Sequence, residues 1–201
     1  AGHVTLLGNN VFDESGAHAD AYRSARHGIG AVFQHPEDQI VTTITEDDVA
    51  FGPENLAIAH DDIDMRIAMS LDAVDMSGQR EADPTRMSGG QQQRVGIAAA
   101  LVTSPRLIIA DEPTTALDSI TQRQIVDLLT SLVDDSGASM LFITHDFSVL
   151  RRATTRCYVL SEGHVVESGA TSMLLECPTT PEATNLVRAA RELSLDVEGG
   201  R

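Results

Sequence analysis

An apolar run that ends in two carboxylates constrains the fold of this chain more than any other segment. It covers residues 107–112 and reads LIIADE, which is typical of a buried strand. An amphipathic helix is predicted over residues 119–133, and a second apolar strand over residues 140–144. A strand, a helix and a strand in this order predict a right-handed crossover and a parallel sheet. The sequence therefore predicts an α/β fold with ligand chemistry at the carboxyl ends of the strands, where Asp111, Glu112 and His145 fall.

The rest of the chain divides into strand-like and helical segments. Short strands are predicted at 2–7 and 28–33, separated by a polar loop over 18–26 that turns through a helix. A helical lobe is predicted from about residue 35 to 103, with a helix entry at 45–48. On a later helix of the lobe, four apolar residues are predicted to share one face: Met65, Met69, Leu71 and Val74. A hairpin is predicted to join 156–160 to 164–167, and a helical, acidic tail follows from 181.

Composition excludes several classes of partner. The 201 residues include 30 acids and 14 bases, which gives a formal net charge of −16. Such a surface repels nucleic acid and anionic lipid headgroups, so we expect no nucleic-acid partner. The two cysteines have no metal-site spacing and favour a reduced cytosolic protein. No apolar run reaches the roughly 20 residues that cross a bilayer, so membrane association is expected to come through a protein partner.

A small-residue run precedes an alanine-rich helix at residues 87–94, which read MSGGQQQR. It offers a hydroxyl and glycine amides at the mouth of the helix, where unpaired N–H groups and the helix dipole favour a phosphate. A run of this kind can also be a simple helix cap.

Together, the MSGGQ and LIIADE segments resemble the signature and Walker B motifs of the ATP-binding cassette (ABC) ATPases. The resemblance implies a P-loop NTPase with a RecA-like parallel sheet and an inserted ABC helical subdomain. It divides the chain into a partial ATPase core at 1–34 and 104–177, a helical subdomain with the signature at 35–103, and a helical tail at 178–201. The segments around Gln34 and at 48–53 (DVAFGP) look most like the ATPase subunits of energy-coupling factor importers.

The resemblance also implies a role for each motif residue. Glu112 is the catalytic base, His145 the switch histidine that contacts the γ-phosphate, and Asp111 a ligand of Mg²⁺. Gln34 reaches the Mg²⁺ and the catalytic water from the Q-loop, and Asp118 belongs to the D-loop, although it can also cap the helix that it opens. In the family the signature contacts the ATP bound by the other subunit, and its residues here are Ser88, Gly89, Gly90 and Gln91.

All 14 basic residues are arginines. Because a P-loop holds phosphates with glycine amides and a lysine, these residues contain none. The family has its P-loop upstream of the first strand, so we expect the domain to be N-terminally incomplete, with the loop before residue 1. We also expect the 201-residue polypeptide alone to be inactive.

The resemblance implies an ATP-hydrolysing subunit that uses ATP and Mg²⁺ and drives solute import. Its expected partners are a second ABC ATPase subunit, identical or different, and the transmembrane subunits of the transporter. Its expected location is cytoplasmic, peripheral on the inner face of the cell membrane. Three alternatives stay open at this point: an ABC ATPase of another transporter class, a non-transport ABC protein acting on DNA or ribosomes, and a non-catalytic interaction module.

Overall fold

The computed structural model describes residues 2–56 and 58–198, with side chains described up to residue 190. The chain forms two compact units, unit 1 (Ala1–Ile143) and unit 2 (Thr144–Arg201). Residues 1, 57 and 199–201 lie outside the described residues. They belong to the predicted ATPase core, helical subdomain and tail, respectively. Among the described residues, no helix is both long and apolar enough to cross a membrane.

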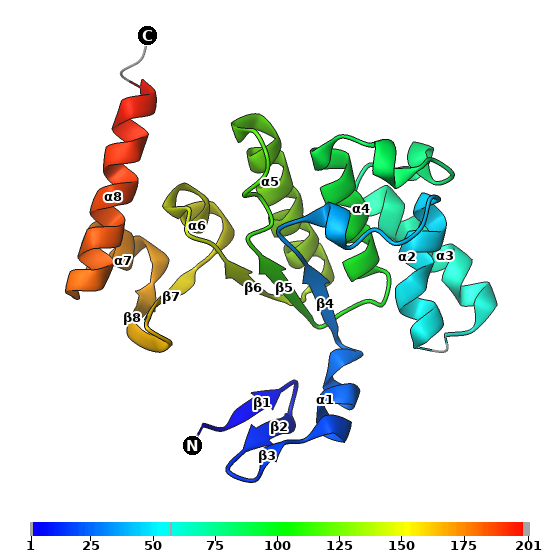
Figure 1. The fold of residues 1–201 in the computed structure, drawn as a ribbon, viewed down its shortest axis with the longest axis horizontal. Helices are drawn as coiled ribbons and strands as arrows, with labels where there is room; N and C mark the ends of the chain where they lie inside the picture. Colours follow the sequence, from blue (N-terminus) through cyan, green and yellow to red (C-terminus); the bar gives the residue numbers. More distant parts are fainter. Residues whose placement is uncertain (1, 57, 199–201) are drawn as a thin grey trace. The chain divides into compact units, whose positions relative to one another are not determined.

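Unit 1 begins with a small antiparallel sheet that only partly matches the predicted strand at 2–7. Its strands run in the order β1-β2-β3, and the helix α1 follows them (Figure 1). Leu7 and Gly8, which join the first two strands, both have positive φ (+48° and +85°), as the tight turns of hairpins require. The bounds are β1 (Val4–Leu6), β2 (Asn9–Asp13), β3 (Gly16–Ala17) and α1 (Ala19–Arg26).

The parallel sheet predicted from the sequence is confirmed. Its three strands run in the order β4-β5-β6, with Val32 opposite Ala110 and Ala110 opposite Phe142. Their carboxyl ends therefore lie level at one edge of the sheet. The bounds are β4 (Ile29–Val32), β5 (Leu107–Asp111) and β6 (Ser139–Ile143), with the crossover helix α5 (Ser119–Ser136) between the last two.

Helix α4 (Gly89–Leu101) lies directly on β4. A Cβ atom added to Gly30 would stand only 2.5 Å from the carbonyl oxygen of Ala100. Because real Cβ atoms do not approach an oxygen so closely, the absence of a side chain at Gly30 is what lets the helix reach the strand. Val95, Ile97 and Ala98 of α4 are also buried, so the helix is part of the core.

Two further helices pack with α4 to form the helical lobe. They are α2 (Thr45–Asn55) and α3 (His60–Ala73), and short 3-10 helices flank them: η1 (Pro36–Asp38), η2 (Ser77–Gln79) and η3 (Pro84–Arg86). The prediction that Met65, Met69, Leu71 and Val74 share one face is wrong. Leu71 and Val74 are fully buried, whereas Met65 and Met69 are 61% and 66% exposed. At 100° per residue, positions 65 and 69 point away from positions 71 and 74.

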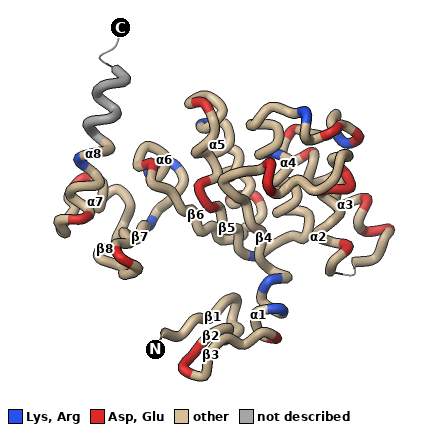
Figure 2. The backbone as a smooth tube through the Cα atoms, viewed as in Figure 1, with Lys and Arg blue, Asp and Glu red and all other residues tan. Residues whose placement is uncertain are grey.

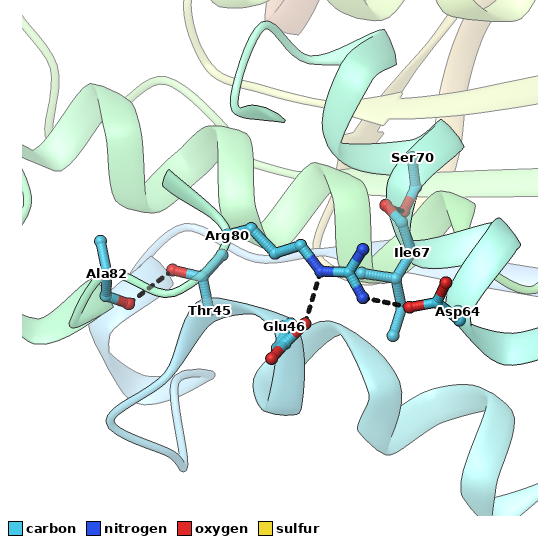
Figure 3. A network of polar contacts seen from close by, with 7 residues as sticks. All are labelled: Thr45, Glu46, Asp64, Ile67, Ser70, Arg80 and Ala82. Carbon is cyan, nitrogen blue, oxygen red and sulfur yellow. Dashed lines mark hydrogen bonds and ion pairs between the residues drawn. The ribbon is translucent and has the colours of Figure 1, made fainter. Parts of the chain in front are cut away.

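Arg80 fastens the connector between η2 and η3 to the lobe (Figure 3). Its Nε donates to Glu46 Oε2 at 2.5 Å, and its guanidinium also pairs with Asp64 on α3. These two hydrogen bonds, the one to Asp64 first, raise the pKa of Arg80. Thr45 adds a bond from its hydroxyl to the carbonyl of Ala82 at 2.9 Å. The segment between η2 and η3, which precedes Ser88, is therefore bound to both α2 and α3.

Unit 2 contains the predicted hairpin. Glu162 and Gly163 join its strands with φ of +49° and +77°, the two left-handed positions of a type I′ turn. One face of the hairpin packs around a core of Cys157, Val159 and Leu174. The bounds are α6 (Phe147–Ala153), β7 (Arg156–Ser161), β8 (His164–Ala170), α7 (Thr171–Glu176) and α8 (Pro181–Glu198).

Candidate functional site

The end of β5 presents Glu112 in an unusual backbone conformation. Its φ is +48°, in the left-handed region that few non-glycine residues adopt. The Glu112 N–H donates to the carbonyl of Ile143 at the end of β6, at 2.9 Å. The turn out of β5 is thus tied to the neighbouring strand. Backbone strain of this kind is concentrated at functional sites, where the surroundings must hold it in place.

Thr115 fixes the carboxylate of Glu112. The Thr115 hydroxyl donates to Glu112 Oε2 at 2.5 Å, and the Thr115 N–H donates to the Glu112 carbonyl at 3.2 Å. Thr114, which is almost fully buried, accepts a bond from Gln122 of α5 at 3.4 Å. The loop from 112 to 115 is therefore held on both sides, which orients a half-buried carboxylate at the sheet edge.

Gln34 and Glu112 leave the sheet at the same edge. Val32 pairs with Ala110, and each of the two side chains stands two residues beyond this pair. Gln34 is half-buried, and Asp111, the last residue of β5, is exposed. The structure therefore brings three of the predicted site residues to the ends of two adjacent strands.

The side chains at this edge offer oxygen donors. In the part of the chain that the structure describes, no group of three or more His, Cys, Asp and Glu side chains is placed to hold a metal. Mg²⁺ keeps several waters and binds through one or two carboxylates together with substrate phosphates. The Asp111 carboxylate and the Gln34 amide oxygen fit that donor set.

The glycine-rich run begins α4 with a capping box. The Ser88 N–H donates to Gln91 Oε1 at 3.0 Å, and the Gln91 N–H donates to Ser88 Oγ at 3.4 Å. The N–H groups of Gly89 and Gly90 lie in the first turn, where a helix provides no acceptor of its own. The cap and the phosphate-binding interpretation are therefore compatible, because the cap orients the first turn and leaves glycine amides at its mouth.

Gly90 brings the start of α4 against the start of α5. A Cβ at Gly90 would stand 2.5 Å from Cγ2 of Thr121. Thr121 in turn donates its hydroxyl to Asp118 Oδ2 at 2.6 Å. The predicted signature and the predicted D-loop are thus neighbours in one subunit.

Asp118 caps α5. Its Oδ1 accepts the N–H groups of Ile120 and Thr121 at 3.0 and 3.1 Å. The hydrogen bond from the Thr121 hydroxyl, followed by these backbone bonds, lowers the pKa of Asp118. The cap predicted from the sequence is present, and the carboxylate is held in its charged form.

His145 lies in unit 2 and is exposed at the start of that unit. The hydroxyl of Thr144 accepts the Asp146 N–H at 3.0 Å, and Asp146 caps α6 by accepting the Ser148 N–H at 2.8 Å. The backbone on both sides of His145 is therefore fixed within unit 2.

Three residues at or beside this site were not predicted from the sequence. Thr115 and Thr121 act through contacts that depend on a turn and on helix packing. The third is Gln93, whose buried amide Nε2 donates to the carbonyl of Phe33, 60 residues away, at 3.1 Å. A signal for Gln93 was present, since a polar residue on the core face of an alanine-rich helix requires a partner.

The chain is similar to proteins of one known family. The profile of the ABC transporter family matches residues 1–115. A Bifidobacterium longum protein described as an ABC transporter ATP-binding protein is 52% identical over 144 residues, which are 72% of this chain and 18% of that protein. The energy-coupling factor transporter ATP-binding protein EcfA of Methanococcus maripaludis is 36% identical over 81% of this chain and 58% of its own length. The chain thus spans less than two thirds of either relative.

The similarity to a solved structure extends over more of this chain than the similarity to either relative. The structure of cbiO1 from Clostridium perfringens, described as part of the ABC transporter complex cbiONQ, superimposes with a TM-score of 0.79 at 27% identity. The similarity covers 88% of this chain and 69% of cbiO1.

Proposed function

The chain belongs to the ABC transporter family, as its motifs predicted, and on this premise we propose that it is the ATP-hydrolysing subunit of an energy-coupling factor importer. The single observation that carries the proposal is the end of β5, where Glu112 is strained, oriented by Thr115 and level with Gln34 on the adjacent strand. The similarity to EcfA and cbiO1 supports the importer class. We further propose that residues 35–103 act as the helical subdomain, inserted into a core made of 1–34 and 104–177, with 178–201 as a tail.

In the proposed mechanism Glu112 is the general base. Its carboxylate accepts a proton from the water that attacks the γ-phosphate of ATP, and the Thr115 hydroxyl donates to one carboxylate oxygen and so holds the carboxylate in place. A base held in this way does not have to be reoriented during the reaction, which lowers the barrier. Gln34, which leaves the same edge of the sheet, would help to orient this water.

Asp111 and Gln34 would hold a Mg²⁺ ion, which neutralises charge on the β- and γ-phosphates when it is bound. Asp111 is suited to this role because it is exposed at the end of a buried strand. His145, at the start of unit 2, would donate a hydrogen bond to the γ-phosphate.

The signature residues Ser88, Gly89, Gly90 and Gln91 would bind the γ-phosphate of the ATP held by a second ATPase subunit. Their position at the mouth of α4 supports this role, because first-turn amides and the helix dipole favour an anion. Asp118, which Thr121 ties to the same corner, would contact the second subunit as part of the D-loop.

The remaining partners follow from the importer class. We propose that transmembrane subunits dock on the chain and hold it at the inner face of the cell membrane, in the cytoplasm. The acidic residues are spread over both units, which argues against a nucleic-acid partner (Figure 2).

Hydrolysis needs a phosphate-binding lysine, and none of the 201 residues is a lysine. The test therefore uses a polypeptide that contains both these 201 residues and a P-loop. It is purified together with its second ATPase subunit and its membrane partner, and we call this complex the assembled ATPase. Glu112→Gln should lower the kcat of the assembled ATPase by about 100-fold or more, because it removes the base and keeps the shape. The polypeptide of these 201 residues alone is the negative control.

The outcome separates the proposal from the non-catalytic alternative. An interaction module would give the same rate of ATP hydrolysis with Glu112→Gln as with the wild type, and that result would overturn the proposal. Turnover by the 201-residue polypeptide alone would show that the expected need for a P-loop is wrong.

A further inference from the structure

Gln93 is a buried polar residue that the mechanism above does not use. It is only 1% exposed, on a helix whose other buried residues are all apolar or glycine: Val95, Gly96, Ile97, Ala98 and Ala100. Its Nε2 donates to the carbonyl of Phe33 at 3.1 Å. Phe33 follows β4 directly and precedes Gln34. The hydrogen bond from Gln93 therefore acts on the peptide group from which Gln34 projects.

The bond belongs to a contact that runs along the whole of β4. Ala100 of α4 lies over Gly30, and Gly96 lies over the side chain of Gln39, which reaches the carbonyl of Ala31 at 3.5 Å. Positions 93, 96 and 100 are three and four residues apart, so they share one face of α4. Gln93 meets the end of β4 and Ala100 meets its start, so α4 runs antiparallel to the strand. The first turn of α4, with Ser88, therefore lies at the same edge as Gln34.

β4 is at the edge of its sheet, because among the described strands it pairs with β5 alone. The carbonyls of Ala31 and Phe33 are two residues apart and point to the same side of the strand. Side-chain amides satisfy both carbonyls, from Gln39 and from Gln93. The Phe33 carbonyl lies in a partly buried contact, where losing its donor costs free energy, so the amide of Gln93 fixes the orientation of the 33–34 peptide.

We propose that Gln93 is a positioning residue that joins the signature helix to Gln34, so that the two move as one body. The inference rests on the proposed function, in which Gln34 contacts the Mg²⁺ and water of one ATP site and Ser88 contacts the ATP of the other. Gln93 thereby links the two ATP sites within a single subunit.

A double-mutant cycle in the assembled ATPase tests this link. Gln93→Met keeps the length of the side chain and removes the donor, and Gln34→Ala removes the group that it positions. If Gln93 acts through Gln34, Gln93→Met raises the Mg²⁺ concentration for half-maximal activity and lowers kcat, each by about fivefold. Adding Gln93→Met to Gln34→Ala then changes neither quantity further. Effects that multiply in the double variant would overturn the proposal.

Two controls separate positioning from general destabilisation. Ser70→Ala removes another buried side-chain bond, from the Ser70 hydroxyl to the carbonyl of Ile67 at 3.1 Å in α3 (Figure 3), and should leave the Mg²⁺ dependence unchanged. Gln93→Asn keeps the amide but is one methylene too short to reach Phe33, so it should reproduce the pattern of Gln93→Met. It also serves if the methionine variant does not fold.

The inference about Gln93 can fail while the proposed function stands, and the two failures give different results. If Glu112→Gln hydrolyses ATP at the wild-type rate, the proposed function fails and the inference fails with it. If Glu112→Gln is inactive but the effects of Gln34→Ala and Gln93→Met multiply, only the link through Gln93 is wrong.

Discussion

At the scale of single residues, the site depends on the left-handed backbone conformation of Glu112, which residues at the end of a strand do not ordinarily adopt. A left-handed non-glycine residue costs about 1–3 kcal/mol, which the surrounding contacts must offset. The sequence predicted the carboxylate pair at the end of a strand. It could not predict the positive φ, because the backbone bond from Glu112 to Ile143 forms only after β6 has paired with β5. Thr115 was missed because its bonds to Glu112 depend on the turn that follows this residue.

Thr115→Val tests whether the orientation of Glu112 matters. The valine keeps the shape of the threonine and removes the hydroxyl that donates to Glu112 Oε2. In the assembled ATPase we expect kcat to fall about tenfold, equivalent to about 1.4 kcal/mol in the barrier, with the KM for ATP unchanged. Thr115→Ser, which keeps the hydroxyl, should retain activity. Equal rates for the valine and serine variants would exclude the orienting role.

Asp118 should make stability depend on pH. Its folded-state pKa is lower than its ordinary value of 3.8, so its stabilising effect is complete above that value and is lost as the pH falls through the lower folded value. The substitution Asp118→Asn keeps a side chain that caps the helix and does not titrate. Urea unfolding from pH 7 to pH 2.5 should therefore show the wild type losing stability relative to Asp118→Asn only below about pH 4. A difference that does not change with pH would contradict this.

At the scale of elements, the patterns of strands and caps were easier to predict than the faces of helices. The order of β5, α5 and β6, the cap at Asp118 and the hairpin turn at Glu162 and Gly163 follow from local patterns, and the structure has all of them. The exposed Met65 and Met69 show where such patterns fail. Which face of α3 is buried depends on its packing against α2 and α4, and apolar residues alone did not reveal it.

The contact between α4 and α5 has a direct test at Gly90. In Gly90→Ala the new Cβ would meet Cγ2 of Thr121 at 2.5 Å, so the Thr121 side chain or the two helices must shift, at a cost of about 1–3 kcal/mol in the free energy of unfolding. Thr121→Ser removes this methyl group and keeps the hydroxyl that donates to Asp118. The next atoms of Thr121 are 3.9 and 4.0 Å away, so the double variant should regain most of the lost stability.

Urea unfolding of the 201-residue polypeptide measures this effect. Gly78→Ala is the matched control, because a Cβ at Gly78 meets no atom within 4 Å. If Thr121→Ser restores nothing to Gly90→Ala, the close approach of Gly90 and Thr121 is not what the glycine is needed for.

At the scale of the whole molecule, the proposed ATP site needs residues of two subunits. Within unit 1, Glu112 and Gln34 leave the sheet at one edge, and the signature begins a helix at that same edge. We propose that the signature serves the ATP of the second subunit, so each ATP site combines Glu112 of one subunit with Ser88 of the other. The net charge of −16 disfavours a nucleic-acid partner. It does not indicate which residues of the two subunits form an ATP site.

Whether the two subunits share their ATP sites is tested by the rate of ATP hydrolysis in an assembled ATPase whose two ATPase subunits are differently tagged copies of this protein. Glu112→Gln and Ser88→Arg are placed either in the same copy or in opposite copies. If the sites are shared, opposite copies leave one ATP site intact and retain activity, whereas the same copy damages both sites and activity is lost. The reverse result, with activity retained only when both substitutions are in the same copy, would show that each subunit builds its ATP site alone.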